Sequence, residues 1–591
     1  MNLRLLWDDL RELPVLIGMA SAVRRAADDS RETFGVLVRE QAQRIPDRTL
    51  LRFESETITY GGFNAMANAF AAVFKQAGVS REPVALMMEN SPALLAAQAA
   101  VAKVGAIGAL INTHLSGAPL SHVLLSSKAR HVFVDAECLP RVVALPECAG
   151  LTIWGQGDAA DLPPHVEPLD AALAAANCSE PAMPDVRCRD VFLYIYTSGT
   201  TGYPKAAIVR HGRYVISGIG LSGLLGLGAN DVMYAPLPLY HGESNFVGFS
   251  VAVRVGGTFA SRRRFSASEF LNDVRRHGAT AFVYVGELCR YLLRQPPTPH
   301  DRDHQLRLAV GAGLRPDIWE KFQQRFGIAR VVEMYGATEG NVSLMNRAGR
   351  VGSVGRPHPF QHSQVRLARY DVANGELLRG PDGFLVPCGV DEPGELLGRI
   401  NTRGPMPYDG YTDSRASEAK VVRNAFRRGD AYFRSGDILR RDRDGYYYFV
   451  DRVGDTFRWK GENVATQEVA EILNGTPGVS ETNVYGVQIP GSDGRAGMAA
   501  LVLEPGAQFD PIAFYAHAEP LPAYARPLFV RIVPAMDVTG TLKQRKMDLQ
   551  RQGYDPSTTN DPLYLRDAAQ RRYVPLTDAL LERIRSGTLR L

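Results

Sequence analysis

Residues 191–205 read V-F-L-Y-I-Y-T-S-G-T-T-G-Y-P-K, a strand pattern followed by a loop of glycines and hydroxyl side chains that ends in a lysine. The apolar, β-branched and aromatic residues at 191–195 predict a buried strand. Glycines let backbone N–H groups approach an anion closely, while hydroxyls and a lysine add donors and positive charge. The stretch therefore predicts a strand that feeds a phosphate-binding loop. Its expected phosphate contacts are Thr197, Ser198, Gly199, Thr200, Thr201, Gly202 and Lys205.

Two alternatives to this interpretation can be weighed from the same residues. The loop is not a Walker loop, because Lys205 follows Pro204 instead of a glycine. A flexible linker rich in Ser, Thr and Gly would explain the composition alone. It would not explain the strand before the loop or the Pro-Lys that ends it.

Strand and helix patterns alternate along the chain, which predicts an α/β fold with parallel sheets. Residues 266–269 form a capping-box pattern that opens a helix, Gly278 can end it, and a strand is expected from Thr280 to Val285. Further strands are expected at 306–310 and 330–334, each followed by a glycine-containing loop. Because ligands of open α/β sheets bind at the carboxyl ends of strands, these loops are expected to converge on one nucleotide. Residues 155–190 show no clear period and are expected to form a surface connection.

Four separated segments carry a resemblance to a known family. They are residues 196–205, 283–293 (V-Y-V-G-E-L-C-R-Y-L-L), 333–341 (E-M-Y-G-A-T-E-G-N) and 455–463 (D-T-F-R-W-K-G-E-N). The first resembles the phosphate signature of the adenylate-forming (AMP-binding) superfamily, which includes acyl-CoA synthetases, luciferases and peptide-synthetase adenylation domains. The other three resemble its fatty-acid transport protein / very-long-chain acyl-CoA synthetase branch. The similarity runs from about Thr33 to the C-terminus.

The resemblance implies a fold and a reaction. It implies a large N-terminal α/β domain with mixed and parallel sheets, residues 1–453, and a small mobile C-terminal α+β domain, residues 454–591. It also implies a fatty acyl-CoA synthetase that uses ATP, Mg²⁺ and coenzyme A, with acyl-AMP as the intermediate. The attacking carboxylate and the α-phosphate are both negative, so cations and N–H donors must neutralise charge as the bond forms.

The resemblance also implies roles for individual residues. Thr338 and Glu339 would lie at the α-phosphate, and Glu339 and Thr197 would bind Mg²⁺, which prefers oxygen ligands. The adenine would be flanked by Tyr335, Gly336, Gly311, Ala312 and Gly313. Asp437 would accept hydrogen bonds from the ribose hydroxyls, and Arg452 would reach the ribose or a phosphate. His241, next to Tyr240, matches a position that lines the acyl pocket, although a structural histidine is the alternative.

The sequence departs from the family pattern at two places in its last third. The hinge position, two residues after Arg452, is Gly454 followed by Asp455, and glycine permits a hinge because it accepts almost any backbone conformation. The catalytic lysine usually follows a Thr-Gly pair directly, but here Thr539-Gly540 is followed by Thr541-Leu542-Lys543. We expect Lys543 to be the adenylating lysine, with Lys546 the second candidate and a solvated surface lysine the alternative. After the hinge turns, Lys460 and Gly461 are expected on the side that admits CoA.

Composition limits the function classes. A chain of 591 residues suggests two or more domains, and 45% hydrophobic with 22% charged residues is typical of soluble globular proteins. A net charge of +4 argues against nucleic acid as a partner. Six cysteines without Cys-x-x-Cys or metal spacing suit a reducing cytosol. The short basic runs at 262–264 and 571–572 are expected to be solvated faces rather than lipid-headgroup sites.

The N-terminal apolar stretch, residues 13–23, is too short to span a bilayer and makes a poor signal peptide, since acidic residues precede it. A cytoplasmic location is therefore expected, with peripheral contact at the inner face of a membrane and a homodimer both left open. Three other functions also stay open: a ligase for a bile, aromatic or medium-chain acid, a fatty-acid carrier, and a ligase that stops at acyl-AMP.

Overall fold

The computed structural model describes residues 26–197, 203–357, 362–372, 374–401, 407–492, 494–538 and 546–589. The chain divides into two compact units, residues 1–362 with 399–422, and residues 363–398 with 423–591. The predicted domain boundary between residues 453 and 454 falls within the second unit and stays a prediction. Among the described residues, no helix combines the length and the hydropathy that a membrane span requires.

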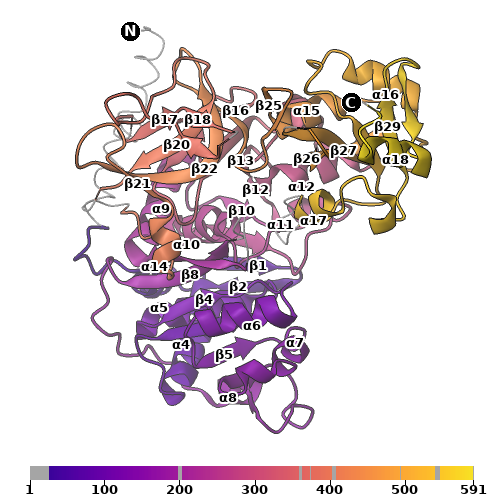
Figure 1. The fold of residues 1–591 in the computed structure, drawn as a ribbon. Helices are drawn as coiled ribbons and strands as arrows, with labels where there is room; N and C mark the ends of the chain where they lie inside the picture. The colour runs from indigo at the N-terminus through magenta and orange to yellow at the C-terminus, as the bar shows by residue number, and fades with distance from the viewer. Residues whose placement is uncertain are drawn as a thin grey trace. The chain divides into compact units, whose positions relative to one another are not determined.

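The first unit contains two large sheets. One is a seven-stranded sheet whose strands are parallel except for the pair β8 and β9. Its order is β7 (Val166–Pro168), β6 (Thr152–Gly155), β5 (His131–Val134), β3 (Pro83–Met87), β4 (Ile107–Leu110), β8 (Val191–Thr197) and β9 (Lys205–Arg210). Helices α4 (Tyr60–Gln76), α5 (Pro92–Val104) and α6 (Gly117–Ser126) lie beside strands β4 and β5 (Figure 1).

The second sheet of this unit has a parallel centre with antiparallel strands at both ends. Its order is β16 (Ser353–Pro357), β15 (Ser343–Asn346), β14 (Arg330–Gly336), β13 (Leu308–Ala312), β12 (Ala281–Val285), β10 (Val232–Tyr234), β11 (Thr258–Ser261), β1 (Thr49–Phe53) and β2 (Glu56–Thr59). The connecting helices include α9 (His211–Leu225), α10 (Ser250–Val255), α11 (Phe270–His277), α12 (Gly286–Arg294) and α13 (Pro316–Phe326). Helix α3 (Phe34–Arg44) packs against α4 and α5.

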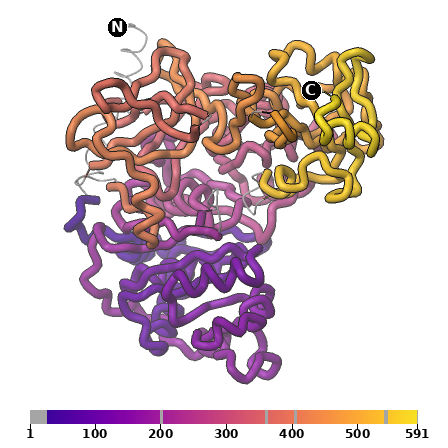
Figure 2. The backbone as a smooth tube through the Cα atoms, in the orientation of Figure 1, coloured from indigo at the N-terminus to yellow at the C-terminus, as the bar shows by residue number. Residues whose placement is uncertain are grey.

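The second unit begins with antiparallel strands in the order β17 (Val365–Ala368), β20 (Gly394–Arg399), β22 (Ala431–Arg441) and β23 (Tyr447–Arg452). A hairpin of β24 (Phe457–Trp459) and β25 (Glu462–Val464) follows. The last sheet has the order β26 (Val479–Gln488), β27 (Arg495–Leu503), β28 (Phe529–Ile532), β29 (Leu563–Asp567) and β30 (Arg572–Pro575), and Figure 2 traces its backbone in gold and yellow. Helices α15 (Thr466–Leu473), α16 (Pro511–Ala518) and α18 (Asp578–Arg585) contribute buried side chains to the core of this sheet.

The expected secondary structure around the predicted loops is confirmed. Strand β8 begins at Val191, as predicted, and runs to Thr197. Helix α11 ends at His277 with Gly278 as its cap, whose φ of +59° is a left-handed conformation that glycine adopts without strain. The expected start of this helix at the capping box 266–269 is wrong, because the N-cap is Glu269 and its side chain makes no capping hydrogen bond. The strands expected at 306–310 and 330–334 are β13 and β14; each ends two residues later than expected, and β13 also begins two residues later.

Two expectations about surfaces can be compared with the structure. Residues 155–190 contain β7 and the helix α8 (Leu169–Ala175), and Glu180 forms an ion pair of 2.6 Å with the fully buried Lys103. Most residues of this connection are exposed or partly exposed, so the expected surface connection is confirmed. Its two short elements were missed because they are too short to show a period. The basic run at 262–264 is ion-paired, Arg262 with Asp273, and Arg263 and Arg264 with acidic residues that include Glu137. Arg264 and the run at 571–572 are exposed, as expected for solvated faces, whereas Arg262 is largely covered.

Candidate active site

The predicted phosphate loop begins in a β-hairpin of the first unit. Strands β8 and β9 are antiparallel, and Thr197 at the end of β8 is the Cα partner of Lys205 at the start of β9. Both predicted end residues of the loop therefore lie at one end of the hairpin. Ser198, Gly199, Thr200, Thr201 and Gly202 lie outside the described residues, so their phosphate contacts stay a prediction.

A tyrosine that the sequence analysis did not identify joins three of the predicted residues. The Tyr411 hydroxyl donates to Glu339 Oε1 over 2.9 Å and also interacts with the Thr197 hydroxyl. The Lys205 ammonium lies 6.0 Å from the centre of the Tyr411 ring. Burial, followed by the Glu339 carboxylate, raises the pKa of Tyr411, so the phenol keeps its proton and remains a donor. We name these four residues, Thr197, Lys205, Glu339 and Tyr411, the carboxylate cluster.

The carboxylate cluster has the donor types that a hard cation requires. Thr197 offers a hydroxyl oxygen and Glu339 a carboxylate, and Mg²⁺ binds oxygen ligands of this kind. The hydrogen bond from Tyr411 engages Oε1 of Glu339, and a carboxylate has a second oxygen that can bind a cation. The residues present therefore fit the predicted Mg²⁺ site.

Arg213 supports the segment that carries Glu339. This buried side chain projects from α9, and its Nη2 donates to the carbonyl of Ala337 over 2.9 Å. Asp409 and Glu339 both act on its guanidinium as negative charges. Asp409 also accepts from Arg210 Nε over 2.6 Å. Sequence reasoning missed Arg213, although one signal was available, because it is the only arginine in the largely apolar segment 211–225.

Thr338 lies close to the predicted acyl-pocket residues. A Cβ placed on Gly242 would stand 3.9 Å from Thr338 Oγ1, so this hydroxyl approaches the residue that follows His241. The rings of Tyr240 and His241 lie 4.6 Å apart. Tyr240 is buried and His241 is half-buried, and the π-helix η2 (Glu243–Phe249) begins directly afterwards. Since π-helical turns occur frequently at functional sites, this local irregularity agrees with a binding role for the segment.

The predicted adenine loop lies where β12 and β13 end, and the backbone there is unusually close. A Cβ on Gly286 would stand 1.7 Å from the carbonyl oxygen of Gly313, and one on Gly311 would stand 2.0 Å from that of Tyr284. Gly313 itself has a φ of +85°. Only glycine fits at these positions, so the loop Gly311-Ala312-Gly313 has a fixed place against the start of α12. Tyr335 and Gly336 end the adjoining strand β14.

Glu333 on β14 is a buried carboxyl beneath this loop. Its Oε2 accepts from the Tyr284 hydroxyl over 2.7 Å, and its Oε1 accepts from the N–H groups of Gly313 and Leu314. These three hydrogen bonds favour the carboxylate, but burial opposes ionisation more strongly and raises the pKa of Glu333 to about 8. This group therefore changes its charge close to neutral pH.

In the second unit, Asp437 and Arg452 are Cα partners on β22 and β23. Arg452 Nε lies 3.9 Å from Asp437 Oδ1, and both side chains reach the surface. A carboxylate beside a guanidinium suits a ribose next to a phosphate, as expected for these two residues. Their contact with a nucleotide stays a prediction.

Lys546 is engaged within the second unit. Its Nζ lies 3.1 Å from Asp455 Oδ2 and donates to Thr466 Oγ1 over 2.6 Å. The N–H and hydroxyl of Thr466 in turn donate to the buried Asp451. Lys546 thus ties the start of α17 (Met547–Gln552) to the residue after Gly454 and to the start of α15. Lys543 lies outside the described residues, so its role stays a prediction.

The backbone at the predicted hinge has room for a change of conformation. Gly454 has a φ of +95°, and a Cβ there would meet no atom of the described residues within 4 Å. Lys460 and Gly461 form the two-residue turn of the β24–β25 hairpin, with φ values of +51° and +84°. This turn type presents the exposed Lys460 at the tip while the neighbouring Trp459 is buried.

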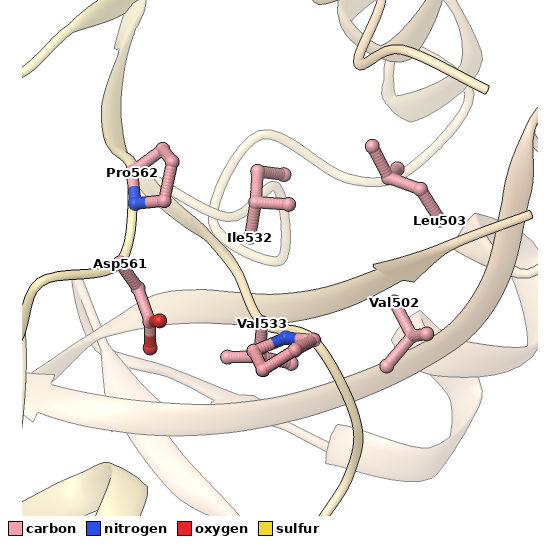
Figure 3. Close-up of a pocket in the computed structure, with 7 residues that line it drawn as sticks. Val502, Leu503, Ile532, Val533, Asp561 and Pro562 are labelled. Atoms are coloured by element: carbon pink, nitrogen blue, oxygen red, sulfur yellow. The ribbon is translucent and has the colours of Figure 1, made fainter. Parts of the chain in front are cut away.

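A shallow pocket of the second unit lies outside this set of residues. Figure 3 shows Val502, Leu503, Ile532 and Val533, from and next to β27 and β28, together with Asp561 and Pro562. Its volume is about 470 Å³. None of the predicted site residues lines it, so it adds nothing to the candidate active site.

Comparison with known proteins places this geometry in a family. The sequence profile described as AMP-binding enzyme matches residues 38–412, and that of the AMP-binding enzyme C-terminal domain matches residues 468–543. The chain belongs to the AMP-binding enzyme family. The predicted superfamily, the α/β fold and the assignment as an enzyme are therefore confirmed.

Relatives of this AMP-binding enzyme match over nearly its whole length. The "Medium/long-chain-fatty-acid--CoA ligase FadD6" of Mycobacterium tuberculosis is 41% identical, covering 96% of this chain and 93% of that protein. The "Long-chain fatty acid transport protein 1" of Mus musculus is 41% identical, covering 99% and 92%. These matches confirm the resemblance to the fatty-acid transport protein branch.

Solved structures agree on the fold. The anthranilate CoA ligase AuaEII has a TM-score of 0.75 at 22% identity, covering 88% of this chain and 96% of its own. ATP-bound MatB from Rhodopseudomonas palustris has a TM-score of 0.74 at 22% identity, covering 88% and 98%. At this identity the likeness establishes the architecture of an adenylate-forming enzyme.

Glu333 predicts how stability depends on pH. With a native pKa of about 8 and an unfolded value near 4.5, the native state holds the extra proton between these limits. The free energy of unfolding should therefore fall as pH rises through this window, by up to about 1.4 kcal/mol per pH unit, and level off above it. Glu333→Gln cannot ionise, so its melting temperature relative to wild type should rise from pH 5 to pH 8.

Melting curves of both proteins at pH 5, 6, 7, 8 and 9 measure this difference. Glu320→Gln, at an exposed position of α13, is the matched control and should show a constant offset. A constant difference between Glu333→Gln and wild type would contradict the raised pKa.

Proposed function

We propose that this chain is a long- or very-long-chain fatty acyl-CoA synthetase, which converts a fatty acid, ATP and CoA into acyl-CoA, AMP and pyrophosphate through acyl-AMP. The observation that carries the proposal is the carboxylate cluster. Its residues gather hydroxyl, ammonium and carboxylate groups at the end of the predicted phosphate loop. Relatives named as fatty-acid–CoA ligases and transport proteins align over almost the full chain.

In the first half-reaction the fatty-acid carboxylate attacks the α-phosphorus of ATP, and the bond to the bridging oxygen breaks in favour of pyrophosphate. Lys205 and the loop 197–202 would hold the β- and γ-phosphates and stabilise the leaving group. The Thr338 hydroxyl would donate to an α-phosphate oxygen. Glu339 and Thr197 would hold Mg²⁺, which supplies charge neutralisation at the phosphates when bound.

Tyr411 and Arg213 would keep Glu339 ready for this role. The phenol donates to one carboxylate oxygen, and the buried guanidinium holds the Ala337 carbonyl two residues earlier. Groups fixed before the reaction cost no reorganisation as charge develops, so this support contributes to rate as well as to binding.

The nucleotide would extend from the adenine loop, with Gly311, Ala312, Gly313, Tyr335 and Gly336 around the base. Asp437 would accept from the ribose hydroxyls and Arg452 would contact the ribose or a phosphate. His241 and Tyr240 would line the acyl pocket beside Thr338, which puts the fatty-acid carboxyl next to the α-phosphate.

In the second half-reaction the CoA thiol attacks the acyl carbonyl and AMP leaves. The domain of residues 454–591 would rotate about Gly454–Asp455, remove Lys543 from the α-phosphate and bring Lys460 and Gly461 to the CoA side. The engagement of Lys546 by Asp455 and Thr466 favours Lys543 as the adenylating residue, because a lysine committed to two internal partners is less able to reach a phosphate.

The proposal includes a cytoplasmic location, with peripheral membrane contact at the inner face and a homodimer left open. Ligases for bile, aromatic or medium-chain acids are the nearest alternative. A pure fatty-acid carrier is a different class, and it is worth testing because several relatives are named fatty acid transport proteins. A pure carrier would release no AMP. A ligase that stops at acyl-AMP would form this intermediate, but the addition of CoA would release no AMP from it.

The acid preference follows from burial of the acyl chain. Each methylene removed from water contributes up to about 0.8 kcal/mol, so eight methylenes contribute up to roughly 6 kcal/mol before the cost of ordering the chain. Palmitate should therefore exceed octanoate and benzoate in kcat/KM. AMP release, measured with and without CoA for acids of about eight to 24 carbons, checks this. Higher kcat/KM with octanoate or benzoate would move the assignment to another acid class.

Substitutions of the two C-terminal lysines should differ in which half-reaction they slow. Lys543→Ala should slow acyl-AMP formation by about 10²–10³-fold, a typical loss for one charge-stabilising donor, and spare thioester formation from supplied acyl-AMP and CoA. Lys546→Ala removes the ion pair with Asp455, so it should lower the melting temperature and affect both steps alike. A selective loss of adenylation in Lys546→Ala, with none in Lys543→Ala, would reverse the assignment.

A further inference from the structure

Glu333 connects three elements of the first unit through one carboxyl group. It lies on β14 opposite Gly311 of β13, and its side chain is 2% exposed. Tyr284, whose hydroxyl donates to its Oε2, belongs to β12. The N–H groups of Gly313 and Leu314, which donate to Oε1, belong to the loop after β13. The carboxyl thus holds the loop to the two strands on either side of β13's end.

The loop needs these acceptors because its N–H groups are directed inward. A Cβ on Gly286 would collide with the carbonyl oxygen of Gly313, so the start of α12 fixes one side of the loop. Removing the carboxyl would take this acceptor from both N–H groups, and that of Leu314 is buried, where an unpaired donor is costly. The loop would then move until water or another group reaches them.

We propose that Glu333 is a positioning residue for nucleotide binding, whose carboxyl holds the Gly311-Ala312-Gly313 loop in the conformation that binds the adenine. This inference rests on the proposed function, since it assigns this loop to the nucleotide. Glu333 does not contact the reacting atoms. Its effect reaches the nucleotide through the loop backbone.

The Glu333 side chain can hold the Gly311-Ala312-Gly313 loop in both of its protonation states. When ionised, Oε2 accepts from Tyr284; when neutral, its O–H can donate to the Tyr284 oxygen while the Tyr284 hydroxyl turns to the Val332 carbonyl, 3.3 Å away. Oε1 accepts from the loop in either state. The titratable groups around it are Tyr284 on β12 and Cys289 on α12, with Glu287, Arg290 and Asp317 further out on α12 and α13.

This arrangement predicts which substitutions are tolerated. Glutamine keeps the length of the side chain, accepts through its oxygen and donates through its amide nitrogen. Glu333→Gln should therefore keep the KM for ATP within about threefold of wild type. Glu333→Leu and Glu333→Asp should raise it at least about tenfold, because leucine lacks the acceptor and aspartate is one methylene too short to reach the loop. The KM for the fatty acid and kcat at saturating ATP should change much less.

The experiment measures both KM values and kcat for the four proteins, together with AMP affinity by calorimetry and melting temperature. Glu333→Asp decides the matter if Glu333→Leu does not fold. A folded Asp or Leu variant with wild-type KM for ATP and wild-type AMP affinity would overturn the inference. Equal losses in Gln, Asp and Leu would also overturn it, since acceptor geometry would then be irrelevant. Absence of acid-dependent AMP release by wild type would instead refute the proposed function.

Discussion

The close approach of two backbone segments, Gly286 and Gly313, is the constraint on which the nucleotide side of this protein depends. No side chain fits between them, so the ends of β12 and β13 and the start of α12 occupy one fixed arrangement. Parallel strands end at the same edge of a sheet, and here glycines let the ends of β12 and β13 approach each other there without steric conflict. Glu333 completes the arrangement by supplying acceptors to the loop N–H groups.

A second group of contacts balances charge near the predicted phosphates. Glu339 is held by the Tyr411 phenol, and the buried Arg213 faces both Glu339 and Asp409. The positive and negative charges nearly compensate within the protein, which lowers the cost of keeping them away from water. A nucleotide and a cation bring further charges of both signs, so the cluster is suited to receive them together.

The strands and glycine loops could be predicted because their signals are local. The apolar run before the loop at 191–195, the cap at Gly278 and the strand ends at Ala312 and Gly336 each depend on a few consecutive residues. Tyr411, Arg213 and Glu333 could not be found in this way. Their partners lie far away in the sequence, as with Tyr411 and Glu339, which are 72 residues apart, so only the folded chain brings them together. The short elements β7 and α8 were not predicted for a different reason, because three and seven residues are too few to show a period.

The central claim is that an acyl-adenylate forms at the carboxylate cluster. Palmitate-dependent exchange of labelled pyrophosphate into ATP tests it most directly, because exchange requires reversible adenylation and nothing afterwards. Glu339→Gln removes a carboxylate charge without changing side-chain size, so exchange should fall at least ~10²-fold while the melting curve stays close to wild type. Glu320→Gln should exchange normally. Normal exchange in a folded Glu339→Gln variant, or no exchange in wild type, would contradict the account.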